Sequence, residues 1–185
     1  RGATILAAAY RNSIPVYCPS PGDSTIGLNM AAKQMYDGEY TVDIVADINE
    51  TAARVYDAVQ KGKSAVLILG GGSPKNFMLQ TVPQVNEIME IPTDGHDYFM
   101  QITDARPDTG GLSGATPSEA VSWGKINPLS LPDSVVAYTD TAIALPIITA
   151  YLLEKCRPRG QKELYKKRQQ LVDKLRQRYL KTRIE

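Results

Sequence analysis

The 185-residue chain has few of the side chains on which metal sites and nucleophile triads depend. It contains two cysteines, Cys18 and Cys156, which lie far apart without a CxxC spacing, and one histidine, His96. The cysteine spacing favours free thiols in a reducing compartment over a disulfide framework. A histidine-based metal site or a Ser-His-Asp triad would depend on His96 alone, which lies in a turn-like Thr-Asp-Gly-His-Asp sequence. We expect neither.

Long apolar runs are also missing. No apolar stretch approaches the length that crosses a bilayer, and the first residues, Arg-Gly-Ala-Thr, do not resemble a signal peptide. The apolar content of 43% and the charged content of 22% are ordinary for a globular domain with a real core. We therefore expect a cytoplasmic protein with no membrane segment. The first residue is not methionine, which suggests a fragment, a processed product or a missing amino-terminal part.

The net charge of +1 conceals a strong asymmetry. Residues 157–185 hold eleven basic and three acidic side chains, a net charge of +8, whereas residues 1–156 carry −7. The basic segment could bind nucleic acid or an acidic partner. It could instead be a helix that docks through apolar residues at helical spacing, namely Leu164, Leu171, Leu175 and Tyr179. Because no aromatic platform accompanies the charge, we favour the docked helix and expect no nucleic-acid partner.

Short apolar runs alternate with amphipathic stretches along the chain. The pattern predicts strands at 14–17, 41–45, 64–69, 98–102 and 135–138. It predicts helices that end near residues 10, 35, 60, 89 and 155, the last beginning at residue 141. The run at 64–69 is continuously apolar, which is typical of a strand buried on both faces of a sheet. This alternation predicts an α/β fold, a mostly parallel sheet with helices on both faces.

In such a sheet, ligands bind beyond the carboxyl ends of the strands. An expected strand precedes each of four loops, which contain Asp23, Gly70-Gly71-Gly72, Asp104-Ala105 and Asp140. The glycines allow a close backbone approach to a ligand, but they form neither a P-loop nor a GxGxxG motif. Each aspartate alone could be a helix cap or a turn residue. Together they favour a nucleotide-type cleft in which carboxylates bind ribose hydroxyls.

The sequence Glu-Ala-Val-Ser-Trp-Gly-Lys at 119–125 has the clearest chemical signature. An amine becomes a nucleophile near neutral pH when burial or a neighbouring cation disfavours its charged form. Trp123 could desolvate Lys125 and hold a cationic substrate over its ring. Glu119 could bind an amine or accept a proton. The alternative is a surface lysine beside a core tryptophan.

Several of these segments together resemble the carboxy-terminal half of deoxyhypusine synthases. The resemblance is carried, in the family's order and spacing, by 14–23, 43–48, 67–72 and 119–126. It implies that residues 1–156 are the carboxy-terminal half of an NAD-binding, Rossmann-like domain and that 157–185 are a basic helical extension. It also implies a homotetramer with shared active sites. Family members carry a longer amino-terminal half, so that half is expected to be disordered or in a separate chain, unless this is a half-length paralogue.

The resemblance implies an NAD-dependent transferase. Such enzymes oxidise spermidine, hold its aminobutyl group as an imine on a lysine, and pass it to a lysine of the hypusine-containing translation factor. By position, Lys125 matches the imine-forming lysine, Glu119 and Trp123 match the substrate pocket, and Gly110 and Gly111 fall in the loop that lines it. The positions that match NAD contacts are Asp23, Gly71, Asp104, Ala105, Asp140 and Thr141.

Three positions depart from the family pattern. The acid expected soon after Asp23 is missing around Leu28, a second pocket acid is Leu112, and the histidine after Lys75 is Asn76, another candidate substrate contact. Each lost charge-assisted hydrogen bond would cost on the order of 1.5–3 kcal/mol of binding. The resemblance implies spermidine as the donor amine, and these departures widen the expectation to a related polyamine. Alternatives are a homospermidine synthase-type enzyme with a small acceptor and a non-catalytic regulatory paralogue.

Overall fold

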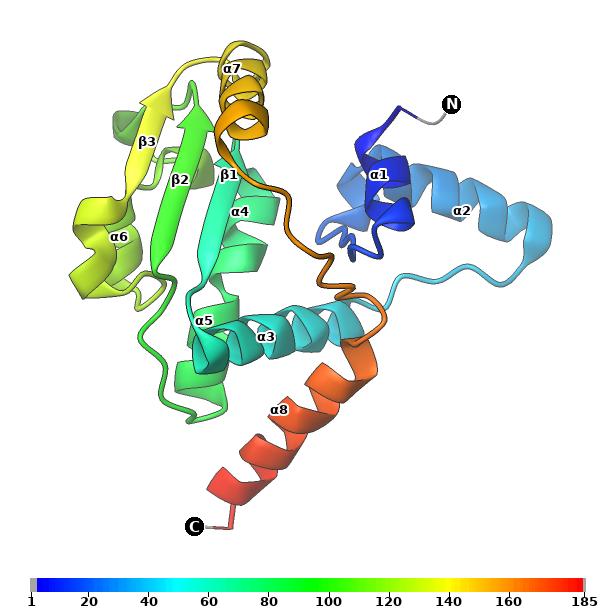
Figure 1. Ribbon diagram of the computed structural model, residues 1–185. Coiled ribbons are helices and arrows are strands. Elements are labelled where there is room, and N and C mark those ends of the chain that lie inside the picture. The colour runs from blue at the N-terminus through cyan, green and yellow to red at the C-terminus, as the bar shows by residue number, and fades with distance from the viewer. Residues whose placement is uncertain (1–2, 185) are drawn as a thin grey trace.

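The computed structural model describes residues 3–184 as an α/β protein around three parallel strands (Figure 1). The strands lie side by side in chain order: β1 (Ala65–Leu69), β2 (Tyr98–Thr103) and β3 (Val135–Tyr138). In the register of the sheet, Ile102 of β2 lies between Leu69 of β1 and Ala137 of β3. The predicted parallel sheet and the expected positions of these three strands are confirmed.

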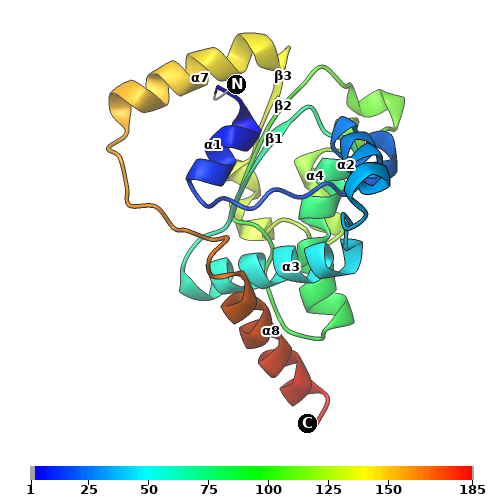
Figure 2. The same ribbon diagram turned by 90° about the vertical axis from the view of Figure 1, so that its right-hand side faces the viewer.

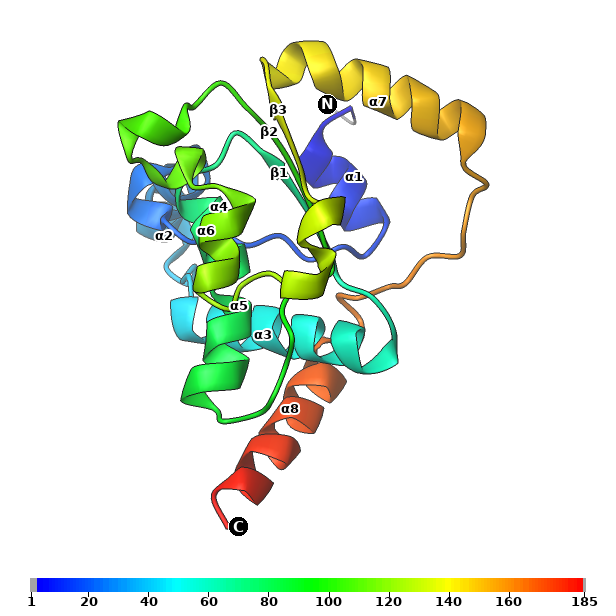
Figure 3. The ribbon, with the colours of Figure 1, turned by 90° about the vertical axis from the view of Figure 1, so that its left-hand side faces the viewer.

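Helices flank both faces of this sheet. They are α1 (Ile5–Arg11), α2 (Thr25–Asp37), α3 (Ile44–Lys61), α4 (Gly72–Leu79), α5 (Thr81–Pro83), α6 (Pro117–Ser122), α7 (Thr141–Lys155) and α8 (Arg168–Thr182). Four short 3-10 segments are described as well, namely η1 (Pro21–Asp23), η3 (Pro107–Thr109), η4 (Leu112–Gly114) and η5 (Pro128–Asp133). A short π-helical segment, η2 (Gln84–Ile88), follows α5. Figures 2 and 3 show α4 and α6 on one face of the sheet and α1 and α7 on the other. Over residues 3–184, no helix combines the length and the apolarity that a bilayer crossing requires.

The two strands predicted in the first fifty residues are wrong. Residues 14–17 are irregular and pair with no described strand. Residues 41–43 are irregular, and α3 begins at Ile44 because Asp43 Oδ1 accepts a hydrogen bond from the Ala46 backbone N–H at 2.9 Å. This cap satisfies an amide that the first helical turn leaves without a partner, and it outweighs the local β-propensity of 41–45.

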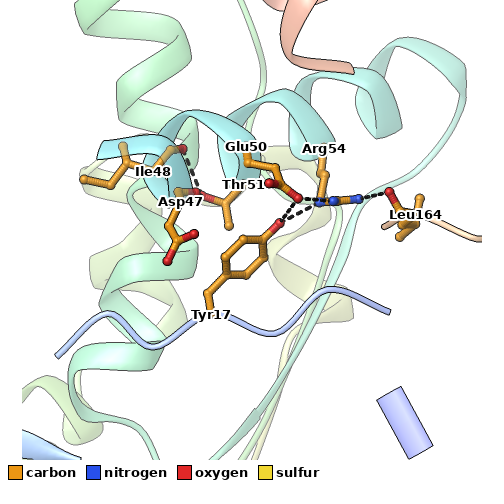
Figure 4. A network of polar contacts seen from close by, with 7 residues as sticks. All are labelled: Tyr17, Asp47, Ile48, Glu50, Thr51, Arg54 and Leu164. Carbon is orange, nitrogen blue, oxygen red and sulfur yellow. Dashed lines mark hydrogen bonds and ion pairs between the residues drawn. The ribbon is translucent and has the colours of Figure 1, made fainter. Parts of the chain in front are cut away.

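A hydrogen-bond network holds the segment at 14–17 in place of a sheet ladder (Figure 4). The Tyr17 hydroxyl donates to Glu50 Oε1 at 2.9 Å and accepts from Arg54 Nε at 2.7 Å. Arg54 also pairs with Glu50 and donates from Nη1 to the Leu164 carbonyl at 2.7 Å. Burial raises the pKa of Tyr17, so the phenol stays protonated as a donor. The network joins the amino-terminal segment, α3 and the start of the basic segment.

Burial along β1 follows the strand period rather than the uniform burial that its sequence predicts. Val66 and Ile68 are buried beside Leu79 of α4, whereas Leu67 is 53% exposed. The prediction that this strand is buried on both faces is therefore wrong for the described residues. The apolar run reflects one face packed against α4 and a second face that the described helices do not seal.

The basic carboxy-terminal segment docks onto the body, as predicted. Leu171 and Leu175 of α8 are buried against Ala52, Ala53 and Tyr56 of α3. Tyr179 packs against the same cluster, and Lys174 Nζ contacts Asp57 at 2.7 Å. Leu164 lies outside this helix, because α8 begins only at Arg168 and residues 157–167 are a connecting segment.

Candidate active site

The carboxyl ends of the three strands meet at one edge of the sheet. The Gly70 amide donates to the Ile102 carbonyl at 2.8 Å, and the Thr139 amide donates to the Thr103 carbonyl at 3.1 Å. The loops after β1, β2 and β3 therefore start side by side, as expected for a ligand-binding edge. These loops carry Gly71 and four further residues that are expected to contact the cofactor, namely Asp104, Ala105, Asp140 and Thr141.

Asp23 was selected because a strand was expected directly before it, and the structure has no strand there. It lies in η1, after an irregular segment instead of a strand. The idea that a strand end presents Asp23 to a ligand is therefore wrong. If Asp23 contacts a cofactor, it does so from η1 in the amino-terminal segment and not from the end of a strand.

Two of the candidates at the strand ends, Asp140 and Gly71, also have a structural role. Asp140 caps α7, since its Oδ1 accepts a hydrogen bond from the Ala142 amide at 2.6 Å. Gly71 is required by packing, because a Cβ there would lie 2.6 Å from Ser113 Cα. Asp104 is exposed, and the amide of Ala105 donates to Thr103 Oγ1 at 3.1 Å. Asp104 and Asp140 are exposed carboxylates at neighbouring strand ends, and carboxylates in this position suit the ribose hydroxyls of a dinucleotide.

A helix end and a short bridge fix the main chain of Lys125 on both sides. Gly124 follows the end of α6 with a φ of +66°, a left-handed conformation that favours glycine. The Lys125 amide then donates to the Ala120 carbonyl at 2.9 Å. On the other side, the His96 amide donates to the Lys125 carbonyl at 3.1 Å, and the Asn127 amide donates to the His96 carbonyl at 3.0 Å.

The Lys125 side chain enters a cavity of about 290 Å³. Its Nζ donates to Asn76 Oδ1 at 2.9 Å, and Glu119, Trp123 and Leu112 line the same cavity. Burial lowers the pKa of the Lys125 ammonium, and the negative charge of Glu119 acts in the opposite direction. The cavity thus brings together the lysine, the carboxylate, the indole and the amide that the sequence selected.

The alternative of a surface lysine beside a core tryptophan is wrong. Trp123 is 63% exposed and Lys125 is the more buried of the two. The indole forms part of the cavity rim, where a ring face is available to a cation. Gly110 and Gly111 are exposed and, among the described residues, the lining includes their neighbour Leu112 instead.

Two buried polar residues were given no role from the sequence, namely Lys75 in the cavity lining and its partner Gln101. Lys75 is only 5% exposed and Gln101 only 1%, and Lys75 Nζ donates to Gln101 Oε1 at 3.0 Å. A glutamine within the apolar strand Tyr-Phe-Met-Gln-Ile-Thr was one available signal, because a buried polar side chain needs a partner. A lysine in the first turn of α4, where the helix dipole disfavours a cation, was another.

His96 is buried, although its sequence suggested an exposed turn. It has no exposed surface, and its Nδ1 lies 2.7 Å from Ser64 Oγ. Burial lowers its pKa to about 4. Among residues 3–184, no group of three His, Cys, Asp or Glu side chains is placed to hold a metal ion.

Comparison with known protein sequences identifies the family of this chain. The sequence profile of the deoxyhypusine synthase family matches residues 1–152, which is most of the chain. The chain belongs to the deoxyhypusine synthase family.

Three proteins of known sequence illustrate the similarity of this chain to other proteins. The chain is 58% identical over 177 residues to the deoxyhypusine synthase-like protein of Nostoc punctiforme, a match that covers 95% of this chain and 45% of that protein. It is 56% identical over 185 residues to the protein of the same description from Thermosynechococcus vestitus (98% and 46% coverage). It is 40% identical over 154 residues to a probable deoxyhypusine synthase 1 of Archaeoglobus fulgidus (83% and 46%). The chain spans about half the length of these relatives.

Two of the three departures from the deoxyhypusine synthase pattern lie in the cavity. Asn76 is the acceptor for Lys125 Nζ, and Leu112 lines the wall near Glu119. Leu28 is 64% exposed on α2 and is not part of that lining. The changes therefore affect the surroundings of the amine that the family pattern marks as reactive.

Proposed function

We propose that this chain carries the lysine-imine centre of an NAD-dependent aminobutyl transferase. The supporting observation is the half-buried Lys125, whose Nζ contacts a neutral amide and shares a cavity with Glu119 and Trp123. An imine-forming lysine must spend part of its time uncharged in a site that restricts water. Burial of Lys125 acts in that direction.

Each side chain of the cavity has a role in this proposal. The neutral Lys125 amine attacks the carbon of the oxidised donor amine, and the remaining part of the donor leaves as an amine. Asn76 orients the Lys125 Nζ through its Oδ1. Glu119 binds the donor ammonium or accepts its proton, and Trp123 offers a ring face to the cation.

The cofactor in this proposal is NAD, which would accept the hydride removed from the donor carbon. Asp104 and Asp140 at the strand ends would bind ribose hydroxyls. Gly71 would allow the backbone to approach the cofactor, and Ala105 and Thr141 would lie beside it. Asp23 would join them from the amino-terminal segment.

The donor proposed is spermidine or a related polyamine, and the acceptor is a lysine of the hypusine-containing translation factor. A second candidate is a homospermidine synthase-type reaction with a small amine acceptor. It is favoured by the cavity lining, which contains one carboxylate, Glu119, while Leu112 and Asn76 occupy positions where the family has ionisable groups. Fewer carboxylates suit an amine with fewer charges.

The assembly proposed is a cytoplasmic homotetramer. Free Cys18 and Cys156 suit a reducing compartment. Helix α7 carries exposed Ile143 and Ile147, and large apolar side chains on one surface are typical of a contact with another subunit.

The experiment is intact-protein mass spectrometry of the complete gene product, incubated with NAD and a panel of polyamines and trapped with borohydride. We expect an aminobutyl-sized mass gain that maps to Lys125 and is lost in Lys125→Arg. The polyamine that gives the adduct identifies the donor. If NAD binds and no polyamine gives an adduct, the proposal is wrong and a non-catalytic paralogue takes its place.

A further inference from the structure

Lys75 is a buried cation whose hydrogen-bond partners are all neutral oxygens. Its Nζ donates to the Ala115 carbonyl at 2.7 Å, to Gln101 Oε1 at 3.0 Å and to the Ser113 carbonyl at 3.3 Å. The side chain is 5% exposed, and Nζ also lies 5.8 Å from the centre of the Phe99 ring. A buried charge is costly without compensation, so a fold that retains one invites a functional explanation.

The orientation of Gln101 shows which atom faces this lysine. Gln101 Nε2 donates to the Gly70 carbonyl and to the Ser113 carbonyl, each at 2.8 Å. Both of its N–H groups therefore have acceptors, and the amide oxygen must face Lys75. Lys75 then has three oxygens for three N–H groups. A neutral amine has only two, so this surrounding selects the ammonium form.

Lys75 and Lys125 line the same cavity, and the residue after Lys75 binds the Lys125 amine. Asn76 Oδ1 accepts from Lys125 Nζ at 2.9 Å, while Lys75 lies on the inner wall. Glu119 of α6 is the charged group that faces both lysines. Two ammonium groups in one partly desolvated cavity disfavour each other's charged state. The proton therefore stays on Lys75, whose Nζ has three hydrogen-bond acceptors.

We propose that Lys75 is a positioning residue for Lys125: its buried ammonium, fixed by three neutral oxygens, favours the uncharged, nucleophilic form of the Lys125 amine. This role rests on the proposed function, because it has a purpose only if Lys125 is the lysine that forms the imine. Burial and the charge of Lys125 lower the pKa of Lys75, while Glu119 opposes both effects. The three hydrogen bonds to neutral oxygens act against this lowering, because they need the ammonium form of Lys75.

The fixed charge does not depend on an acid that a substrate could displace. The three oxygens belong to β2 (Gln101), to η4 (Ser113) and to Ala115, which follows η4, so Lys75 also ties α4 to β2 and to the η4 segment. A substrate ammonium bound at Glu119 would neutralise the one anion facing Lys125. The influence of Lys75 would then be unopposed, so donor binding itself would promote deprotonation of Lys125.

Competitive acetylation tests this proposal without any catalysis. The complete gene product is labelled with trace acetic anhydride from neutral to alkaline pH, and mass spectrometry follows the peptide that contains Lys125. We expect Lys75→Met to raise the midpoint of Lys125 reactivity by about one pH unit. Lys33→Met, which removes an exposed cation on α2, is the matched control and should leave the midpoint unchanged. Glu119→Gln should move it downward.

An unchanged midpoint in a folded Lys75→Met variant would overturn the proposal and leave Lys75 with a purely structural role. If that variant does not fold, ¹⁵N NMR of the native protein decides the matter. We expect Lys75 to give an ammonium signal, with three hydrogens on nitrogen, at a pH where Lys125 no longer does. The reverse order of deprotonation would refute the proposal. A missing imine adduct with a normal midpoint shift would refute the transferase function alone.

Discussion

Lys125 Nζ lies 2.9 Å from Asn76 Oδ1, so the reactive candidate of this family member rests against an uncharged amide where the family pattern has a histidine. A neutral acceptor orients the amine without stabilising its proton strongly. The pKa of Lys125 is therefore lowered by burial, and the charge of Glu119 opposes this effect.

Asn76→Asp should suppress reactivity at Lys125. A carboxylate at hydrogen-bond distance favours the ammonium, so the pKa of Lys125 rises, by about one to three units for a close opposite charge. The rate of borohydride-trapped imine formation near neutral pH should fall about tenfold for each unit. Asn76→Gln keeps a neutral amide and serves as the control. Equal pH–rate profiles for the Asp and Gln variants would contradict this electrostatic account.

Asp140 should have two separable roles. Asp140→Ala removes the cap of α7 and should lower the free energy of unfolding by about 1 kcal/mol, whereas Asp140→Asn retains a capping oxygen. Urea denaturation measures this difference. If the carboxylate also binds ribose, both variants should weaken NAD binding in calorimetry. Asp43→Ala, which removes the equivalent cap of α3, should reduce stability without changing NAD affinity.

Docking of the basic helix should depend on its buried leucines. Leu175 is 3% exposed against α3, so Leu175→Ala should lower the free energy of unfolding by about 2–5 kcal/mol. Leu180 on the same helix is 49% exposed, and Leu180→Ala is the matched control with a small effect. Chemical denaturation gives both values. Similar small losses for the two variants would mean that α8 does not pack as described.

His96 should make the protein less stable as pH falls below the range of a free histidine. Its folded pKa is about 4, below the ordinary 6.5, so between these values the unfolded chain binds a proton that the folded chain excludes. Stability contributed by the neutral imidazole is complete above about pH 6.5 and declines towards pH 4, by at most about 1.4 kcal/mol per pH unit.

Denaturation curves between these pH values measure the slope due to His96. His96→Leu should flatten the dependence of stability on pH in this range, since leucine has no group that titrates. The depressed pKa of Asp97 acts in the same direction but only near and below its ordinary value of 3.8, so the two contributions occupy different pH ranges. An unaltered slope in His96→Leu would assign the pH dependence to other groups.

Local sequence was sufficient to predict strands, helices and site residues wherever the apolar pattern agreed with the packing. The strands at 98–102 and 135–138 and the helix from Thr141 to Lys155 occur where the apolar pattern predicts them. The loops after these strands share one edge because parallel strands leave no other arrangement. The string at 119–125 placed Glu119, Trp123 and Lys125 around one cavity, since its members lie within two helical turns. Their contacts with substrate and NAD stay a prediction.

The failures have a common physical origin in contacts between distant residues. The β-branched residues at 41–45 favour a strand, but a strand needs a partner, and the Asp43 cap satisfies the chain locally. Tyr17 is fixed by Glu50 and Arg54, more than thirty positions away. Lys75 and Gln101 are separated by 26 residues, and only the pairing of β1 with β2 brings them together.

The backbone bonds on either side of Lys125 have a mechanical consequence. The anchored segment from Gly124 to Asn127 cannot travel with its side chain, because its amides and carbonyls are engaged by Ala120 and by His96. Any swinging motion is then confined to the four methylene groups of one lysine arm. If Lys125 forms the proposed imine, an acceptor amine would have to reach this stationary arm through the cavity that Trp123 and Leu112 help to line.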